Sequence, residues 1–159
     1  MDTYAVERVA LLSIRPEFAE AIFTGRKVVE FRRSRLAPDI NRALVYATSP
    51  TARVIGWFSV SGISESTPDG LWRQFRRHGA IRRRDYFDYF EGASRAYGIR
   101  IERATRLGEP VLLDALEPGL RAPQSFQYLS ASRLDDLVGI TAGAPSTIPR
   151  PQMRPLFGI

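Results

Sequence analysis

Residues Arg8–Arg32 read RVALLSIRPEFAEAIFTGRKVVEFR, a pattern that predicts a strand, a helix and a second strand in succession. The first seven of them, 8–14, form a short apolar segment typical of a buried strand. Pro16 favours helical φ in a first turn, and Gly25 is typical of the residue that follows a helix. Residues 27–32 then predict the second strand, so this stretch alone indicates a fold that mixes helix and sheet.

The rest of the chain adds more strands than helices, joined by connections of mixed length. This arrangement favours an α+β fold built on a small curved sheet or β-barrel of about five or six strands, with helices covering the barrel ends. Further strands are expected at 42–47, 53–63 and 94–101, an extended or turn segment at 123–129, and helices from Pro68 through Phe75 (ended by Gly79), at 84–90 and at 132–138.

The length of 159 residues corresponds to one ordinary domain with a core of its own. We expect that domain to occupy residues 1–138. The last segment, 139–159, contains four prolines and little apolar content before Leu156. Such a composition predicts a loosely packed or disordered C-terminal tail.

Several classes of protein are excluded by composition. The chain has no cysteine and a single histidine, which excludes disulfides, cysteine-based zinc sites, a cysteine nucleophile and multi-histidine metal sites. No segment approaches the roughly 20 apolar residues of a membrane span, and the N-terminus lacks the pattern of a secretory signal. We therefore expect a cytoplasmic protein with no membrane partner, no resident cofactor and no metal site, and the oligomeric state stays open.

The positive charge of the chain points to an anionic partner. The net charge is +6 and the sequence pI is about 10.3, which favours polyanions such as nucleic acid. Only one of the 23 basic residues is a lysine, Lys27. A lysine amine, unlike a guanidinium, can lose its proton when it is removed from water and then act as a base or nucleophile. A single lysine can equally remain by chance.

The motif GRKVVEFR at 25–32 places candidate functional residues at the junction of helix and strand. Glu30 and Arg32 lie two apart in a strand and therefore share one face, where they can pair or line a cleft. Lys27 joins them only if it projects from the turn or if a bulge intervenes. A neighbouring carboxylate keeps a lysine charged, whereas desolvation favours the neutral amine, and the sequence leaves both open.

This motif resembles the GxKxxExR signature of the ASCH domain family, a group of small PUA-like proteins, through Gly25, Lys27, Glu30 and Arg32. The resemblance extends to a subgroup with four further segments, which together span residues 8–130. In this chain they are LLSIRP at 11–16, YATSP at 46–50, LW at 71–72 and PQSFQYL at 123–129.

The resemblance implies a PUA-like barrel with the signature residues lining a cleft beside the first helix. The family is associated with RNA binding, with the handling of modified nucleosides and, in some members, with ribonuclease activity. Similar small bacterial proteins that hydrolyse N4-acetylcytidine carry threonine at the position of Glu30 and a second carboxylate elsewhere. Glu65 is the candidate for that carboxylate by position in this chain.

The preferred hypothesis is an RNA- or nucleotide-binding domain that recognises a nucleobase or modified nucleoside in this cleft. Arginines would contact phosphates, an aromatic ring would stack on a base, and polar side chains would supply hydrogen bonds. The binding residues expected for these roles are Arg32, Arg33, Thr48, Ser49, Trp72, Gln124, Ser125 and Tyr128.

Two alternatives remain beside the binding hypothesis. In a hydrolase, either an N4-acetylcytidine amidohydrolase or a ribonuclease, Lys27 would be base or nucleophile and Glu30 would orient it or carry protons. A divalent metal at Glu30 is possible in the nuclease case. The same two residues can instead form a structural ion pair that shapes the turn. The second alternative is a regulatory protein-interaction module that uses the tail or the aromatic residues at 86–90 as its contact surface.

Overall fold

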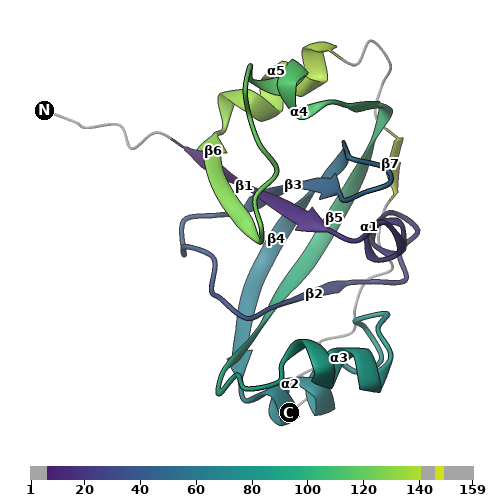
Figure 1. Cartoon of the computed structure of the whole chain (residues 1–159), viewed down its shortest axis with the longest axis vertical. Coiled ribbons are helices and arrows are strands. Elements are labelled where there is room, and N and C mark those ends of the chain that lie inside the picture. The colour runs from purple at the N-terminus through teal and green to yellow at the C-terminus, as the bar shows by residue number, and fades with distance from the viewer. Residues whose placement is uncertain (1–6, 141–145, 149–159) are drawn as a thin grey trace, which may run out of the picture.

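The computed structural model describes residues 7–140 and 146–148 and contains one curved sheet with helices at both ends (Figure 1). The strands are β1 (Arg8–Ile14), β2 (Val29–Arg32), β3 (Arg42–Ala47), β4 (Arg53–Ser66), β5 (Ala96–Val111), β6 (Phe126–Ser130) and β7 (Ser146–Ile148). The helices are α1 (Pro16–Phe23), α2 (Pro68–Phe75), α3 (Arg83–Tyr89), α4 (Leu113–Leu116) and α5 (Ser132–Ile140).

The strand order is β2-β5-β4-β3-β1-β6. Strand β7 pairs with residues 104–106 of β5, and β2 pairs with residues 97–100 of the same strand. The β1–β3 pair is parallel and the other pairs are antiparallel. The α+β class and the helices at the ends of the curved sheet are confirmed. The expected barrel is not closed, because β2 and β6 end the path at opposite edges and no ladder between them is present in the described part of the chain.

Helix α1 covers one face of the sheet. Pro16 occupies its first turn, and its buried residues include Ile22 and Phe23, which pack with Phe58 and the inward side chains of β1 and β3. Gly25 follows the helix with φ of +82°, a left-handed conformation that costs glycine little. This turn sends the chain directly into β2.

The two ends of the sheet have separate apolar clusters. At one end, α4 and α5 pack on the face of β1, β3 and β4 that is opposite α1. At the other end, α2 and α3 pack together on β2 and the start of β5, with Phe31, Phe75 and Tyr86 at the centre. Figure 1 shows α2 and α3 side by side at the lower end of the molecule and α4, α5 and β6 at the upper end.

Strand β5 is twice as long as the sequence pattern predicts. It continues to Val111 rather than ending at residue 101. The pairing of β4 with β5 shifts register near Val60, which breaks the simple alternation of inward and outward side chains. The exposed Glu102 and Arg103 therefore look like the end of a strand in the sequence although the strand continues.

The predicted boundary at residue 138 falls inside α5, which continues to Ile140. Within the segment expected to be a tail, Ser146–Ile148 pairs with β5. The remaining residues of that segment, 141–145 and 149–159, lie outside the described residues. None of the helices in the described ranges is both long enough and apolar enough to cross a membrane.

Candidate functional site

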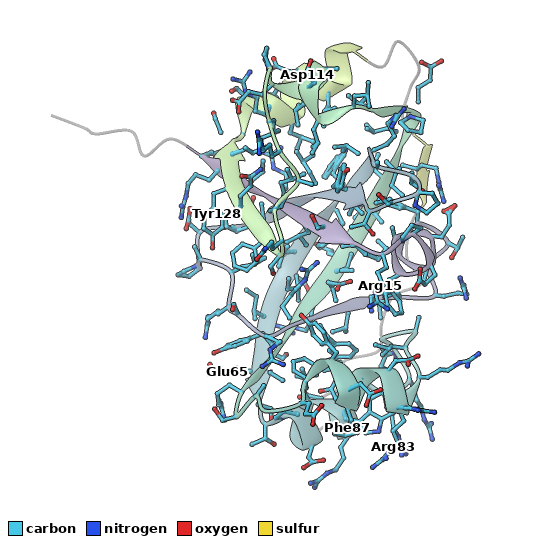
Figure 2. The ribbon with its side chains drawn as sticks, in the orientation of Figure 1. Arg15, Glu65, Arg83, Phe87, Asp114 and Tyr128 are labelled. Carbon is cyan, nitrogen blue, oxygen red and sulfur yellow. The ribbon has the colours of Figure 1, made fainter. Side chains whose placement is uncertain are left out.

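A cleft of about 860 Å³ lies where β2 faces the C-terminal end of β1. Its volume is within the range of pockets that bind small molecules or single nucleotides. Arg15, at the N-terminus of α1, is one of the lining residues and is labelled in Figure 2. The other walls come from β2, α3, the turn after β3 and the segment before β6. The complete lining is Ser13, Ile14, Arg15, Phe18, Lys27, Glu30, Phe31, Arg32, Arg33, Ser34, Thr48, Ile81, Asp85, Asp88, Tyr89, Gln124 and Ser125.

Three charged residues of the signature motif meet in the wall of this cleft. Glu30 and Arg32 lie on the same face of β2, and Lys27 projects from the turn that precedes the strand. The Lys27 Nζ atom is 3.8 Å from Glu30 Oε2, and Arg32 Nε is 3.6 Å from Glu30 Oε1. One carboxylate therefore lies between two cations, and all three residues are buried.

The Lys27 amine is held in apolar surroundings. It donates a hydrogen bond of 2.6 Å to the carbonyl oxygen of Gly79 and lies 5.2 Å from the ring centroids of both Phe18 and Phe31. Only 2% of the residue is exposed. Burial lowers the pKa of Lys27, and the nearby Glu30 carboxylate opposes this effect. The environment therefore favours the neutral amine more than water does.

Arg32 joins two parts of the sheet that are not neighbours in the strand order. Its guanidinium donates to the carbonyl oxygen of Ser13, at 2.9 Å, and to the carbonyl and hydroxyl oxygens of Ser125, both at 3.3 Å. Ser13 itself donates from its hydroxyl to Pro123. These bonds link β2 to β1 and to the segment before β6, and they close the cleft wall between strands that share no backbone ladder among the described residues.

Two polar atoms of the motif are buried at the cleft without a hydrogen-bond partner among the described residues. They are Glu30 Oε2 and Arg32 Nε. Both atoms are enclosed and each faces an ion-pair partner, Lys27 Nζ at 3.8 Å from Glu30 Oε2 and Glu30 Oε1 at 3.6 Å from Arg32 Nε, so a polar ligand reaches them only when this cluster opens. One is an acceptor and the other is a donor, which suits a group that carries both a hydroxyl and an anionic oxygen.

The rim of the cleft has mixed charge. Arg33 donates to the carbonyl oxygens of Tyr89 and Glu91, which ties β2 to the end of α3. Burial raises the pKa of the Tyr89 hydroxyl, and Arg32 opposes this effect. Asp85 and Asp88 of α3 also line the cleft. In the described ranges, no group of three or more His, Cys, Asp or Glu residues is arranged to hold a metal ion.

The structure brings together most of the residues predicted from the sequence. Thr48 reaches the cleft because its backbone amide bonds to Ile14 at the end of β1, and Ser125 reaches it through its backbone bond to Ser13. The predicted residues in the lining are Lys27, Glu30, Arg32, Arg33, Thr48, Gln124 and Ser125.

Ser49, Trp72 and Tyr128 do not line the cleft. The Tyr128 hydroxyl accepts a hydrogen bond from the Ala37 amide, and its ring lies under the Arg8 guanidinium. The Trp72 ring packs against Tyr86 and Phe87 in the apolar cluster between α2 and α3. The sequence shows that an aromatic residue is present, but not whether its ring faces the cleft or packs against other side chains. Trp72 and Tyr128 could therefore not be assigned to either position from the sequence.

Glu65 is also outside the cleft lining. Its carboxylate pairs with Arg35 at 3.1 Å and with Arg95 at 3.2 Å. Conversely, the sequence analysis missed Asp85, Asp88 and Tyr89 as lining residues. Their spacing of three and four residues places them on one face of a helix, and this spacing is the feature of the sequence that could have identified them as one surface.

Comparison with known proteins supports the relationship inferred from the motifs. The family model for the ASCH domain matches residues 12–105. A protein of Zymomonas mobilis subsp. mobilis named ASCH domain-containing ribonuclease is 34% identical over 137 residues, which cover 84% of this chain and 92% of that protein.

Solved structures agree in fold. The crystal structure of ASCH from Zymomonas mobilis has a TM-score of 0.78 and 32% identity, covering 84% of this chain and 96% of that one. Structures of its tyrosine-to-phenylalanine and serine-to-alanine mutants have the same TM-score. The N-terminal domain of Staphylothermus marinus McrB, at 11% identity and a TM-score of 0.51, shares the fold alone, over 83% of this chain and 92% of that one. The α+β, PUA-like fold is thus confirmed, and this chain belongs to the ASCH domain family.

Proposed function

We propose that this protein binds single-stranded RNA with one nucleotide in the cleft, and that it cleaves the strand there. Proteins read individual RNA nucleotides mainly from unpaired strands, whose bases can be turned out into a pocket. The cleft volume of about 860 Å³ is sufficient for one nucleotide. The ribonuclease name of the Zymomonas relative supports an activity on RNA.

The observation that carries the proposal is the buried amine of Lys27 beside Glu30, on a cleft wall where Glu30 Oε2 and Arg32 Nε have no hydrogen-bond partner among the described residues. A lysine whose pKa is lowered by burial is a better general base near neutral pH than an exposed lysine. Arg32 uses its terminal nitrogens to hold Ser13 and Ser125, and this places its positive charge at the cleft wall, where it attracts a phosphate.

The proposed reaction is transfer of the phosphodiester to the neighbouring hydroxyl of the ribose. The neutral amine of Lys27 takes the proton of the 2′-hydroxyl, and the 2′-oxygen forms a bond to phosphorus. The bond from phosphorus to the 5′-oxygen breaks, and that oxygen takes a proton from water. The products carry a 2′,3′-cyclic phosphate and a 5′-hydroxyl. Arg32 stabilises the additional negative charge on phosphorus in the transition state, and Glu30 orients the amine.

The test uses a fluorescent single-stranded RNA of about 20 nucleotides, with Mg²⁺ and with EDTA. Wild-type protein is expected to produce 2′,3′-cyclic phosphate ends. Both Lys27→Ala and Lys27→Arg should lower the rate by about 100-fold or more, because the arginine keeps the charge but loses the titratable amine. Arg26→Ala, which removes an exposed cation from the same turn, is the matched control and should keep the rate. Retained cleavage in Lys27→Arg excludes the lysine as the base.

A binding protein without cleavage is the second candidate, and the ion cluster favours it. Glu30 lies between Lys27 and Arg32, and Arg32 also bonds to Ser13 and Ser125. These contacts hold the cleft walls in place, and this structural role needs no catalysis. Salt-sensitive retention of RNA without any product would assign this function. N4-acetylcytidine belongs in the same assay, although Glu65, the carboxylate suggested for that reaction, is engaged with two arginines outside the cleft.

A further inference from the structure

Six exposed arginines lie on the helices α2 and α3 and on the connection between them, outside the cleft lining. We call them the arginine patch: Arg73, Arg76, Arg77, Arg82, Arg83 and Arg84. They lie within residues 71–84, which contain no acidic residue. Residues 68–90, which contain the patch, hold six arginines and three aspartates and therefore carry +3 of the net charge of +6. Half of the net positive charge that predicts an anionic partner is therefore found in this segment.

The arginine patch differs from several other arginines in its contacts. Arg8 pairs with Asp39, and both Arg35 and Arg95 pair with Glu65. Within the described ranges, none of the six guanidinium groups of the patch forms an ion pair or donates a hydrogen bond. Unpaired guanidinium groups at this density repel one another, so a polyanion bound across them gains free energy from all of them.

Aromatic rings adjoin the arginine patch. The Arg83 guanidinium lies over the Phe87 ring, at 4.8 Å from its centroid, and Figure 2 labels both residues at the lower end of the molecule. The Phe87 ring is in turn 5.9 Å from Trp72, and both rings are half-buried. Arginines interleaved with aromatic faces are the usual surface for an unpaired nucleic-acid strand, whose phosphates bind the cations while bases stack on the rings.

The arginine patch adjoins the cleft along α3, although none of its six residues is part of the cleft lining. Arg84 precedes Asp85, which lines the cleft, and α3 as a whole is only about 10 Å long. The loop between α2 and α3 is also bound to the signature motif, through the Gly79 carbonyl on Lys27 and the His78 carbonyl on the Val28 amide. A strand that leaves the cleft along α3 therefore meets the arginine patch within a few nucleotides.

We propose that the arginine patch is a second RNA site, which binds the phosphates of the strand that flanks the nucleotide in the cleft. This inference rests on the proposed RNA function and specifies its substrate class: strands of several nucleotides, not free nucleosides or dinucleotides. Trp72, which does not reach the cleft, supplies a stacking surface at this second site together with Phe87.

The experiment compares pairs of exposed arginines. Arg76→Gln/Arg77→Gln and Arg83→Gln/Arg84→Gln remove charge from the arginine patch, and Arg103→Gln/Arg121→Gln removes two exposed arginines elsewhere. Binding of a 2′-O-methyl RNA of about 20 nucleotides, which cannot be cleaved by the proposed route, is measured by fluorescence anisotropy over a range of KCl concentrations. A dinucleotide of the same chemistry is measured in parallel.

Each patch variant is expected to bind the long RNA about tenfold more weakly, and its plot of log affinity against log salt should be shallower by about 1.4. Dinucleotide binding and the slope of the control variant should stay as in the wild type. Equal affinity and slope in patch and control variants overturn the inference, even if Lys27 variants have lost cleavage. Binding of the same variants to anionic lipid vesicles is measured as well. Patch variants that lose vesicle binding but bind RNA as the wild type does also overturn the inference. If wild-type protein binds no long RNA at all, both the proposed function and this inference fail.

Discussion

At the scale of single residues, the chemistry depends on how water is excluded around Lys27. Its amine lies between two phenyl rings and one carbonyl oxygen, and burial lowers its pKa although a carboxylate is nearby. Glu30 pairs with Arg32 as well, so its charge is shared between two cations. A carboxylate divided in this way stabilises the charged lysine less than an exclusive partner does.

The lowered pKa predicts that the free energy of unfolding rises with pH. The lysine of the unfolded chain keeps its proton up to about its usual pKa of 10.5, whereas the folded state releases it at a lower pH. Between these two values the unfolded state binds more protons, and stability therefore increases with pH. The Lys27→Met variant has no lysine to titrate, so its free energy of unfolding should rise less with pH than that of the wild type.

Urea denaturation of wild type and Lys27→Met from about pH 7 to about pH 10 measures the difference. Near the end of this range the tyrosines of the unfolded chain begin to ionise, whereas burial raises the pKa values of Tyr86 and Tyr89 in the folded state. This effect lowers the stability of both proteins alike, so the difference between them reports on Lys27. Parallel pH profiles of the two proteins would show that the folded lysine titrates like a free one.

At the scale of elements, the turn between α2 and α3 positions the amine. Gly79 packs so closely on the Phe31 ring that a Cβ atom there would overlap it, and the following Ala80 has φ of +48°. The turn is thereby seated on β2, and the Gly79 carbonyl reaches Lys27. The sequence pattern placed this glycine at the end of a helix, but α2 ends at Phe75 and the glycine instead permits a close approach.

Gly79→Ala should therefore affect both stability and cleavage. We expect a loss of roughly 1–3 kcal/mol of unfolding free energy, because Phe31 or the turn must move. Displacement of the carbonyl by about 1 Å should slow RNA cleavage by up to about 100-fold. Stability is measured by chemical denaturation and cleavage with the fluorescent RNA.

Gly25→Ala is the matched control for this substitution. Its Cβ meets no atom, but the left-handed φ of +82° costs about 1–2 kcal/mol for alanine. It should lower stability to a similar extent and leave cleavage within about twofold of the wild type, because the Lys27 contacts stay in place. An equal loss of cleavage in both variants would show that Gly79 acts through general stability alone.

At the scale of the whole molecule, the sheet connects three apolar clusters of unequal size. Strand β3 has an apolar cluster on each face, whereas α2 buries only Leu71 and Phe75, and α3 buries only Tyr86. The cleft lies between the large clusters and this smaller helical end. The site thus combines a wall formed by β1 and β2 with a wall formed by α3, where fewer apolar residues are buried.

Hydrogen exchange should show this difference. Amides of α2 and α3, in peptides covering 68–90, are expected to open at a free energy lower by roughly 2 kcal/mol or more than those of β3 and β4, in peptides covering 42–60. The expectation follows from the smaller buried surface of the helical end. Exchange measured by mass spectrometry under native conditions tests it, and equal protection of the two regions would mean that the molecule opens only as one unit.

Local patterns in the sequence determined much of this protein. Interactions between near neighbours in the chain determine the ends of β1 and β3 and the common face of Glu30 and Arg32. The proline ring of Pro16 likewise determines the start of α1. For the same reason, the motifs were sufficient to predict the family and seven of the seventeen residues that line the cleft.

Only the tertiary structure decided the features that join distant segments. The sheet stays open and Arg32 bridges its strands, Lys27 is buried against Gly79 and two rings, and Trp72 lies at the arginine patch. Each of these depends on contacts between residues that are far apart in the chain. The burial of a side chain, its pKa and its position in the cleft or in the core depend on the residues that surround it in the folded protein. A sequence pattern, which describes only near neighbours in the chain, does not contain this information.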